Sequence, residues 1–139
     1  MRENIKMYDL DDKELIIPPG IPESVIARVV EMCNVRFDVK EDEINNTKYM
    51  VLVGKEENLE KAKKLLSIIT ELKLLLRDLA RMGRRHKLKV NIYVDDENIR
   101  YILSKIINDV ANKEYLNLAE ELPDDYEIIK IKDIPIYVF

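Results

Sequence analysis

The sequence lacks tryptophan and glutamine, and it contains one cysteine, one histidine and three widely separated glycines. The single cysteine, Cys33, excludes an intrachain disulfide, and one histidine excludes the common zinc sites built from several cysteines and histidines. Three separated glycines leave no glycine-rich phosphate loop or dinucleotide fingerprint. No run of about 18 apolar residues is present and the N-terminus lacks the apolar core of a signal peptide, so we expect a cytoplasmic protein with no membrane span.

The composition is that of a globular protein with an acidic balance. The 139 residues are 47% hydrophobic and 36% charged, and the formal net charge is -4 at pH 7. A chain of this length forms one domain, or two small halves that share a core. Abundant Ile, Lys, Glu and Asn without Gln resemble the proteins of heat-loving archaea, so a thermophile-like, archaeal source is expected.

The first half predicts strands and one short helix. The expected elements are a strand at 13–18, a helix that begins at Pro22, a strand at 35–39 and a strand at 49–54. The helix has one apolar stripe of Val25, Ile26, Val29, Val30 and Cys33. In the strand at 35–39, alternation predicts that Val35, Phe37 and Val39 point inward and that Arg36 and Asp38 point outward.

A long helix is predicted over 58–87, because this stretch contains no proline and its apolar residues recur at steps of three and four. Gly83 is expected to stop the helix near its C-terminus.

The second half starts again with a strand at 88–95, followed by a helix capped by Asp95 or Asp96. The acidic stretch 116–125 reads as an irregular connection. A final hairpin turns at Lys132-Asp133, with Pro135 marking an edge position.

These elements predict an α+β fold in the order β-α-β-β-α-β-α-β-β, with helices on one face of a mostly antiparallel sheet, in a KH-like or ferredoxin-like arrangement. The predicted organisation is a tail at 1–12, a βαββα half at 13–87 and a βαββ half at 88–139, which together form one compact unit.

Residues 13–70 resemble a KH domain, a small module that binds single-stranded nucleic acid. The resemblance is carried by "LIIPPGIP", "VRFDV" and "YMVLVGKEENLEKAKKLLSII", in which a strand ends in Gly54 and a short charged turn leads into a helix. The sequence departs from the family in lacking the GxxG loop, because it has room for one helix between Pro22 and Val35 and no glycine there. The family's binding residues therefore cannot be transferred to this chain.

The segment "RDLARMGRRHKLK" (77–89) is basic in an acidic chain. Its candidate nucleic-acid-binding residues are Arg77, Arg81, Arg84, Arg85, His86, Lys87 and Lys89, and Asp78 is its one acid. These side chains predict an electrostatic contact with phosphates, with RNA as the expected partner. The alternative is that they suit a helix C-terminus and pair with acidic loops such as 41–43 or Asp124-Asp125. Tyr93 and Tyr101 are the nearest rings, so little stacking is expected.

The long helix offers a second candidate surface. Its apolar stripe includes the candidate interface residues Leu65, Ile69, Leu72, Leu76 and Leu79, and Leu74 lies off this stripe. One hypothesis is a homodimer, or an adaptor that docks another protein, across the helix at 58–82. The alternative is that both halves of the chain share this stripe as their core.

No catalytic, cofactor or metal site is predicted. Cys33 lies on an apolar stripe, and the three serines, Ser24, Ser67 and Ser104, lie in helical contexts without a nucleophile motif. The carboxylate clusters at 41–43, 95–97 and 124–125 are better explained as turns and a helix cap. We therefore expect a non-enzymatic binding module. A ligand-sensing domain would need a pocket, which nothing in the sequence marks.

Overall fold

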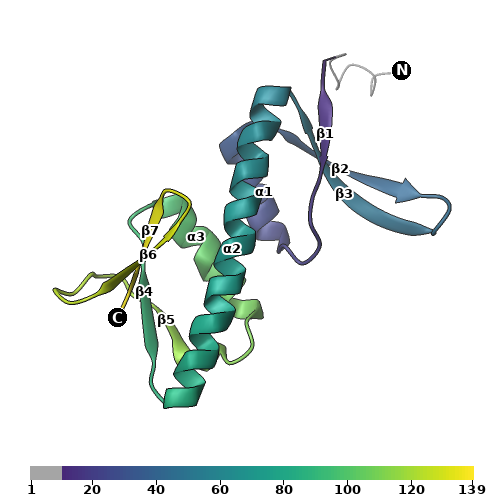
Figure 1. The fold of residues 1–139 in the computed structure, drawn as a ribbon. Helices are drawn as coiled ribbons and strands as arrows, with labels where there is room; N and C mark the ends of the chain where they lie inside the picture. The colour runs from purple at the N-terminus through teal and green to yellow at the C-terminus, as the bar shows by residue number, and fades with distance from the viewer. Residues whose placement is uncertain (1–10) are drawn as a thin grey trace. The chain divides into compact units, whose positions relative to one another are not determined.

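The structure is a computed structural model that describes residues 11–139. The chain divides into two compact units, which we call unit 1 (residues up to Leu66) and unit 2 (Ser67–Phe139). The division falls within the long helix α2 (Glu56–His86), whereas the sequence suggested a division at the end of that helix. Each unit combines helices with a sheet, so the predicted α+β class is confirmed (Figure 1).

Unit 1 contains a three-stranded antiparallel sheet and the helix α1 (Glu23–Cys33). The sheet has the order β1-β3-β2, from β1 (Lys13–Ile16), β3 (Thr47–Gly54) and β2 (Arg36–Asp42). The predicted stripe of α1 is buried at Val25, Ile26, Val29 and Cys33. The helix ends where Asn34 adopts a left-handed conformation, with φ of 55°. One helix therefore lies between β1 and β2, in agreement with the prediction.

The strand β2 is only partly covered, which corrects one expectation. Val35 is buried, but Phe37 is 45% exposed and Val39 is 49% exposed, so the side of β2 that was predicted to point inward is not fully covered. Phe37 does face α1, with which it lines a cavity of about 250 Å³. The reason is position: β2 is an edge strand, and no other strand among residues 11–139 pairs with its outer side.

The helix α2 extends three residues past Gly83, so the prediction that this glycine stops the helix is wrong. The stop is a Schellman motif, in which the Leu88 N–H donates to the Gly83 carbonyl (3.0 Å) and the Lys87 N–H donates to the Arg84 carbonyl (3.3 Å). Lys87 takes the left-handed position, with φ of 55°. Gly83 is needed for space instead, because a Cβ there would lie 2.8 Å from the Leu88 carbonyl oxygen and 3.0 Å from the Tyr115 Cβ.

Unit 2 contains the helix α3 (Glu97–Ile106), the short 3-10 helices η2 (Ile107–Asp109) and η3 (Lys113–Tyr115), and a four-stranded sheet. The strand order is β5-β4-β7-β6, from β5 (Leu116–Leu118), β4 (Val90–Tyr93), β7 (Ile134–Val138) and β6 (Glu127–Ile131). β5 is parallel to β4, and the other pairs are antiparallel. Asp96 caps α3 as predicted, since its carboxylate accepts from the Ile99 N–H at 3.0 Å.

Two features of this sheet differ from the sequence-based expectation. The stretch 116–125 was expected to be irregular, but its first three residues form β5. Pro135 was expected at an edge, but β7 lies between β4 and β6. Proline is tolerated there because β4 pairs with β7 only at Val138 and Tyr137, so Pro135 pairs with Lys130 of β6 but has no partner in β4.

Candidate nucleic-acid interface

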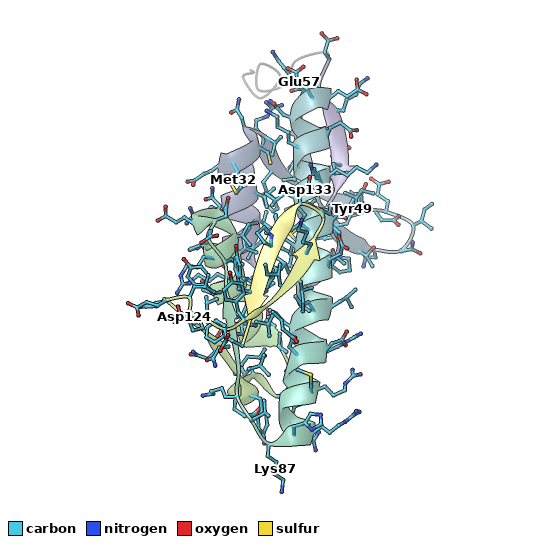
Figure 2. The ribbon with its side chains drawn as sticks, turned by 60° about the vertical axis from the view of Figure 1, so that its left-hand side comes forward. Met32, Tyr49, Glu57, Lys87, Asp124 and Asp133 are labelled. Atoms are coloured by element: carbon cyan, nitrogen blue, oxygen red, sulfur yellow. The ribbon has the colours of Figure 1, made fainter. Side chains whose placement is uncertain are left out.

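The basic segment forms the C-terminal end of α2 and the turn that leads to β4. All seven predicted binding residues are exposed: Arg77, Arg81, Arg84, Arg85, His86, Lys87 and Lys89. The first five lie on the last turns of α2, and the last two lie between α2 and β4. Figure 2 shows Lys87 at the end of α2, pointing away from the ribbon. Since the turn is fixed by the Schellman hydrogen bonds, these side chains are carried by an ordered backbone.

Most positive charges of this segment have no ion-pair partner among residues 11–139. Among residues 11–139, the one ion pair of the segment joins Arg77 Nε to Asp78 Oδ1 at 3.8 Å, and both side chains are more than half exposed. The alternative hypothesis pairs these cations with acidic loops, and the described residues contain no such ion pair within 4.0 Å. The basic helix end therefore presents its charge to solvent, where it can contact an anion.

The apolar stripe of α2 is buried, whereas the basic helix end is exposed. The five predicted interface residues, Leu65, Ile69, Leu72, Leu76 and Leu79, are all buried, with exposed fractions of 0 to 7%. The large apolar side chains of α2 that remain exposed are Leu74 (46%) and Met82 (42%). Leu74 lines a cavity of about 340 Å³ with Lys73, Arg77 and the end of α3. Self-association across α2 would therefore have to use Leu74 and Met82 instead of the five predicted residues.

A cluster of tyrosines on the unit 2 sheet was missed by the sequence reasoning. The rings of Tyr93 and Tyr137 have centroids 5.9 Å apart, and Tyr126 meets Tyr137 edge-on at 5.0 Å. Tyr101, which the sequence placed near the basic segment, lies on α3 with the Lys105 ammonium 5.3 Å from its ring centroid. The cluster depends on strand register, which the sequence does not display. The pairing of β4 with β7 brings together Tyr93 and Tyr137, which are far apart in the sequence.

Asp95 links two of these tyrosines. The Tyr137 hydroxyl donates to Asp95 Oδ2 at 3.5 Å. A hydrogen bond to Asp95 raises the pKa of the Tyr93 hydroxyl, and burial followed by the Asp95 charge raises the pKa of Tyr137. The Tyr137 hydroxyl is therefore directed to Asp95, while the rings of Tyr93 and Tyr137 stay partly exposed.

A cavity of about 410 Å³ lies where β4 ends and α3 begins, lined by Tyr93, Val94, Asp95, Glu97, Arg100 and Glu120. It is open, and its carboxylates outnumber its one cation. The Arg100 guanidinium is engaged, because Nη1 donates to the Ala119 carbonyl at 2.6 Å. The acidic end of the sheet therefore lies past the tyrosines, at the opposite end of β4 from Lys89.

The cysteine and the carboxylate clusters do not form a metal site in the described part of the chain. Cys33 is buried, and burial raises the pKa of its thiol, which disfavours the reactive thiolate. In the cluster at 41–43, the Asp42 carboxylate accepts from the Ile44 and Asn45 N–H groups and from the Asn45 side chain, and these bonds lower its pKa. No group of three or more acidic, His or Cys side chains in the described part of the chain is placed to hold a metal ion.

No helix among residues 11–139 is long and apolar enough to cross a membrane.

The fold and this interface define an α+β protein of two units with an exposed basic helix end. The chain belongs to the Uncharacterized protein MJ0093 family, whose model matches residues 4–138. It is similar to "Uncharacterized protein MJ0093" of Methanocaldococcus jannaschii, with 59% identity over 136 residues, 97% of this chain and 96% of the relative. That organism is an archaeal thermophile, in agreement with the source that the composition predicts. No solved structure matches the chain.

Proposed function

We propose that this protein is a non-enzymatic module that contacts RNA through the basic helix end of α2. The observation that carries the proposal is an exposed cluster of cations at a fixed helix terminus, with a single acid, Asp78, among them. Arg84 and Arg85 can each hold a phosphate with two parallel hydrogen bonds, and Lys87 and Lys89 add point charges. Residues 13–70 resemble KH domains, which also bind single-stranded nucleic acid. The proposal does not depend on this resemblance, because the GxxG loop is missing.

The binding is mainly electrostatic. A contact that neutralises four phosphates on a single strand gives a slope of about -3 for the logarithm of the binding constant against the logarithm of salt concentration. Affinity should then fall about 50-fold between about 50 mM and about 200 mM salt. Phosphate contacts discriminate weakly among sequences, so affinity alone should change little with base order.

The test is fluorescence anisotropy with a labelled short single-stranded RNA. The test variant carries Arg84→Glu, Arg85→Glu and Lys87→Glu. A matched control carries Lys61→Glu, Lys63→Glu and Lys64→Glu, three exposed lysines at the other end of the same helix. Both variants change the net charge equally. The proposal expects the first variant to lose binding and the control to retain most of it.

Two results would contradict this function. The first is an absence of RNA binding by the wild-type protein even at low salt. The second is an equal loss in both variants, because that would mean that only net charge matters. Sedimentation of the same samples examines the alternative, a homodimer or a protein adaptor: self-association that persists in both charge variants and is lost in Leu74→Asp would favour the exposed part of α2 as the interface.

A further inference from the structure

The sheet of unit 2 has one buried face and one open face. The buried face carries Val90, Ile92, Leu116, Ile131, Ile136 and Val138, all of which are at most 8% exposed. The residues between them point the other way. Register places Tyr93 opposite Tyr137, and Tyr137 opposite Ile128, across three neighbouring strands. Tyr126 precedes β6 by one residue and shares the side of Ile128 by alternation. We call Tyr93, Tyr126, Tyr137 and Ile128 the tyrosine face.

The tyrosine face is apolar and accessible. Tyr126 is 42% exposed and Ile128 is 51% exposed, while Tyr93 and Tyr137 are half-buried. The rings touch, with centroids 5.0 and 5.9 Å apart and ring planes inclined by 86° and 57°, so they form one aromatic cluster whose rings face different directions. Among the described residues of unit 2, the ion pairs are Arg77–Asp78 and Lys132–Glu71, and neither covers this face. A contiguous exposed apolar patch with a polar border is typical of a binding surface.

The tyrosine face is connected to the basic helix end through β4. Lys89 directly precedes β4, and Asn91 and Tyr93 are alternate residues of this strand that lie on the same face. At a rise of about 3.3 Å per residue, the distance from Lys89 to Tyr93 is about 13 Å. A chain held by its phosphates at Arg84, Arg85 and Lys89 therefore reaches the rings within a few units of its length.

We propose that the tyrosine face is the base-stacking surface of the RNA site, which makes the ligand a single strand rather than a duplex. This inference depends on the proposed function, because the basic helix end supplies the phosphate contacts. Bases stack on aromatic rings when they are unpaired, whereas the bases of a duplex are already stacked on each other. Since every base has a flat aromatic face, stacking adds affinity without sequence specificity.

The charges around the tyrosine face also define where the RNA ends. Asp95, Glu97 and Glu120 lie past the rings, around the cavity at the end of β4. Their negative charges repel phosphates, so the strand enters from the basic end and its last bases rest on the rings. Because the Tyr137 hydroxyl donates its proton to Asp95, stacking on the rings does not depend on that hydroxyl as a donor.

The experiment compares three labelled probes of equal phosphate number: a short single-stranded RNA, a duplex of half its length, and an abasic single strand. Wild-type protein should bind the single strand about tenfold more tightly than the abasic strand, because each stacked base contributes about that factor. In the variant Tyr93→Leu/Tyr137→Leu this preference should disappear while the salt dependence remains. Tyr93→Phe/Tyr137→Phe keeps the rings and should bind like wild type, and Tyr49→Leu in unit 1 is the matched control.

Each outcome decides between the two proposals. Equal binding of the three probes by wild-type protein, or an unchanged preference in the leucine variant, would overturn the stacking surface while leaving the basic helix end as the RNA contact. Loss of binding in the leucine and phenylalanine variants alike would also overturn it, since the hydroxyls would then matter. The inference would also be wrong if the wild-type protein bound a lysine-rich peptide instead of RNA and Tyr93→Leu/Tyr137→Leu abolished that binding. The partner of the tyrosine face would then be a basic protein. The alternative variant Tyr126→Leu, at the most exposed ring, repeats the measurement if the double variant is unstable.

Discussion

The open faces of the two sheets carry different chemistry. In unit 1, Lys40 Nζ reaches Glu14 Oε2 at 2.8 Å, and Arg36 pairs with Asp12. The register places Lys40 and Glu14 on the two outer strands, on the same face as Val51 of the central strand β3, which is completely buried. In unit 2, the corresponding face carries tyrosines and has no ion pair among the described residues. Charges that pair across a strand satisfy each other, whereas exposed rings leave apolar area available to a ligand. This difference is why we place the ligand on unit 2.

The largest expected effect distinguishes fully buried positions from half-exposed positions in each unit. Leu52→Ala in unit 1 and Ile136→Ala in unit 2 remove side chains with an exposed fraction of 0%. Each should lower the free energy of unfolding by about 3 kcal/mol, from lost burial and the cavity left behind. Val39→Ala and Ile128→Ala, at positions that are 49% and 51% exposed, should each cost less than about 1 kcal/mol. Chemical denaturation of the four variants measures the difference, and similar losses at all four positions would contradict the burial described for them.

The sequence predicted the local structure well because the relevant signals are local. The apolar spacing of α2, the cap at Asp96 and the turn at Lys132 each depend on residues within a few positions of one another. The sequence also identified the basic helix end, because its charges lie close together in the chain. The fold class follows from the same elements.

The features that the sequence did not predict depend on which strands become neighbours. Tyr93 and Tyr137 meet because β4 pairs with β7, and no local pattern carries that register. Phe37 looked like a core residue because alternation reports which side a residue faces, not whether an edge strand is covered. β5 is three residues long and parallel to β4, so it is too short for periodicity to mark.

A smaller effect is expected at the two glycines that the packing requires, one in each unit. In a helix interior, Gly→Ala ordinarily stabilises by about 1 kcal/mol. Gly83→Ala should instead destabilise by about 1 to 2 kcal/mol, because the new Cβ would lie 2.8 Å from the Leu88 carbonyl oxygen, a backbone atom that cannot move without breaking the Schellman turn. Gly54→Ala should cost less, since its Cβ would meet the Val35 side chain at 3.1 Å. Thermal unfolding gives the sign directly, and a stabilised Gly83→Ala protein would show that the end of α2 packs less closely than described.

The smallest effect concerns pH and belongs to unit 2. Asp95 raises the pKa of Tyr93 through a hydrogen bond, and it adds to the effect of burial on the pKa of Tyr137. A hydroxyl whose folded-state pKa is raised contributes stability that is fully present below the ordinary tyrosine pKa of about 10 and is lost as the pH rises through the folded-state value. Stability should therefore fall above about pH 10, and Asp95→Asn should reduce this fall because the amide no longer repels a phenolate.

Alkaline titration followed by the absorbance of tyrosinate, with denaturation at several pH values, measures both consequences of Asp95. Asp124→Asn is the control, because it removes a carboxylate of unit 2 that does not act on either hydroxyl. Since both tyrosines are accessible to solvent, the effect on stability should be small, and the titration is the more sensitive measurement. If Asp95→Asn leaves the tyrosine titration unchanged while Asp124→Asn alters it, Asp95 does not hold the hydroxyls. The hydroxyls would then be available to a ligand, and the ring faces would no longer be the only contact that the tyrosine face offers.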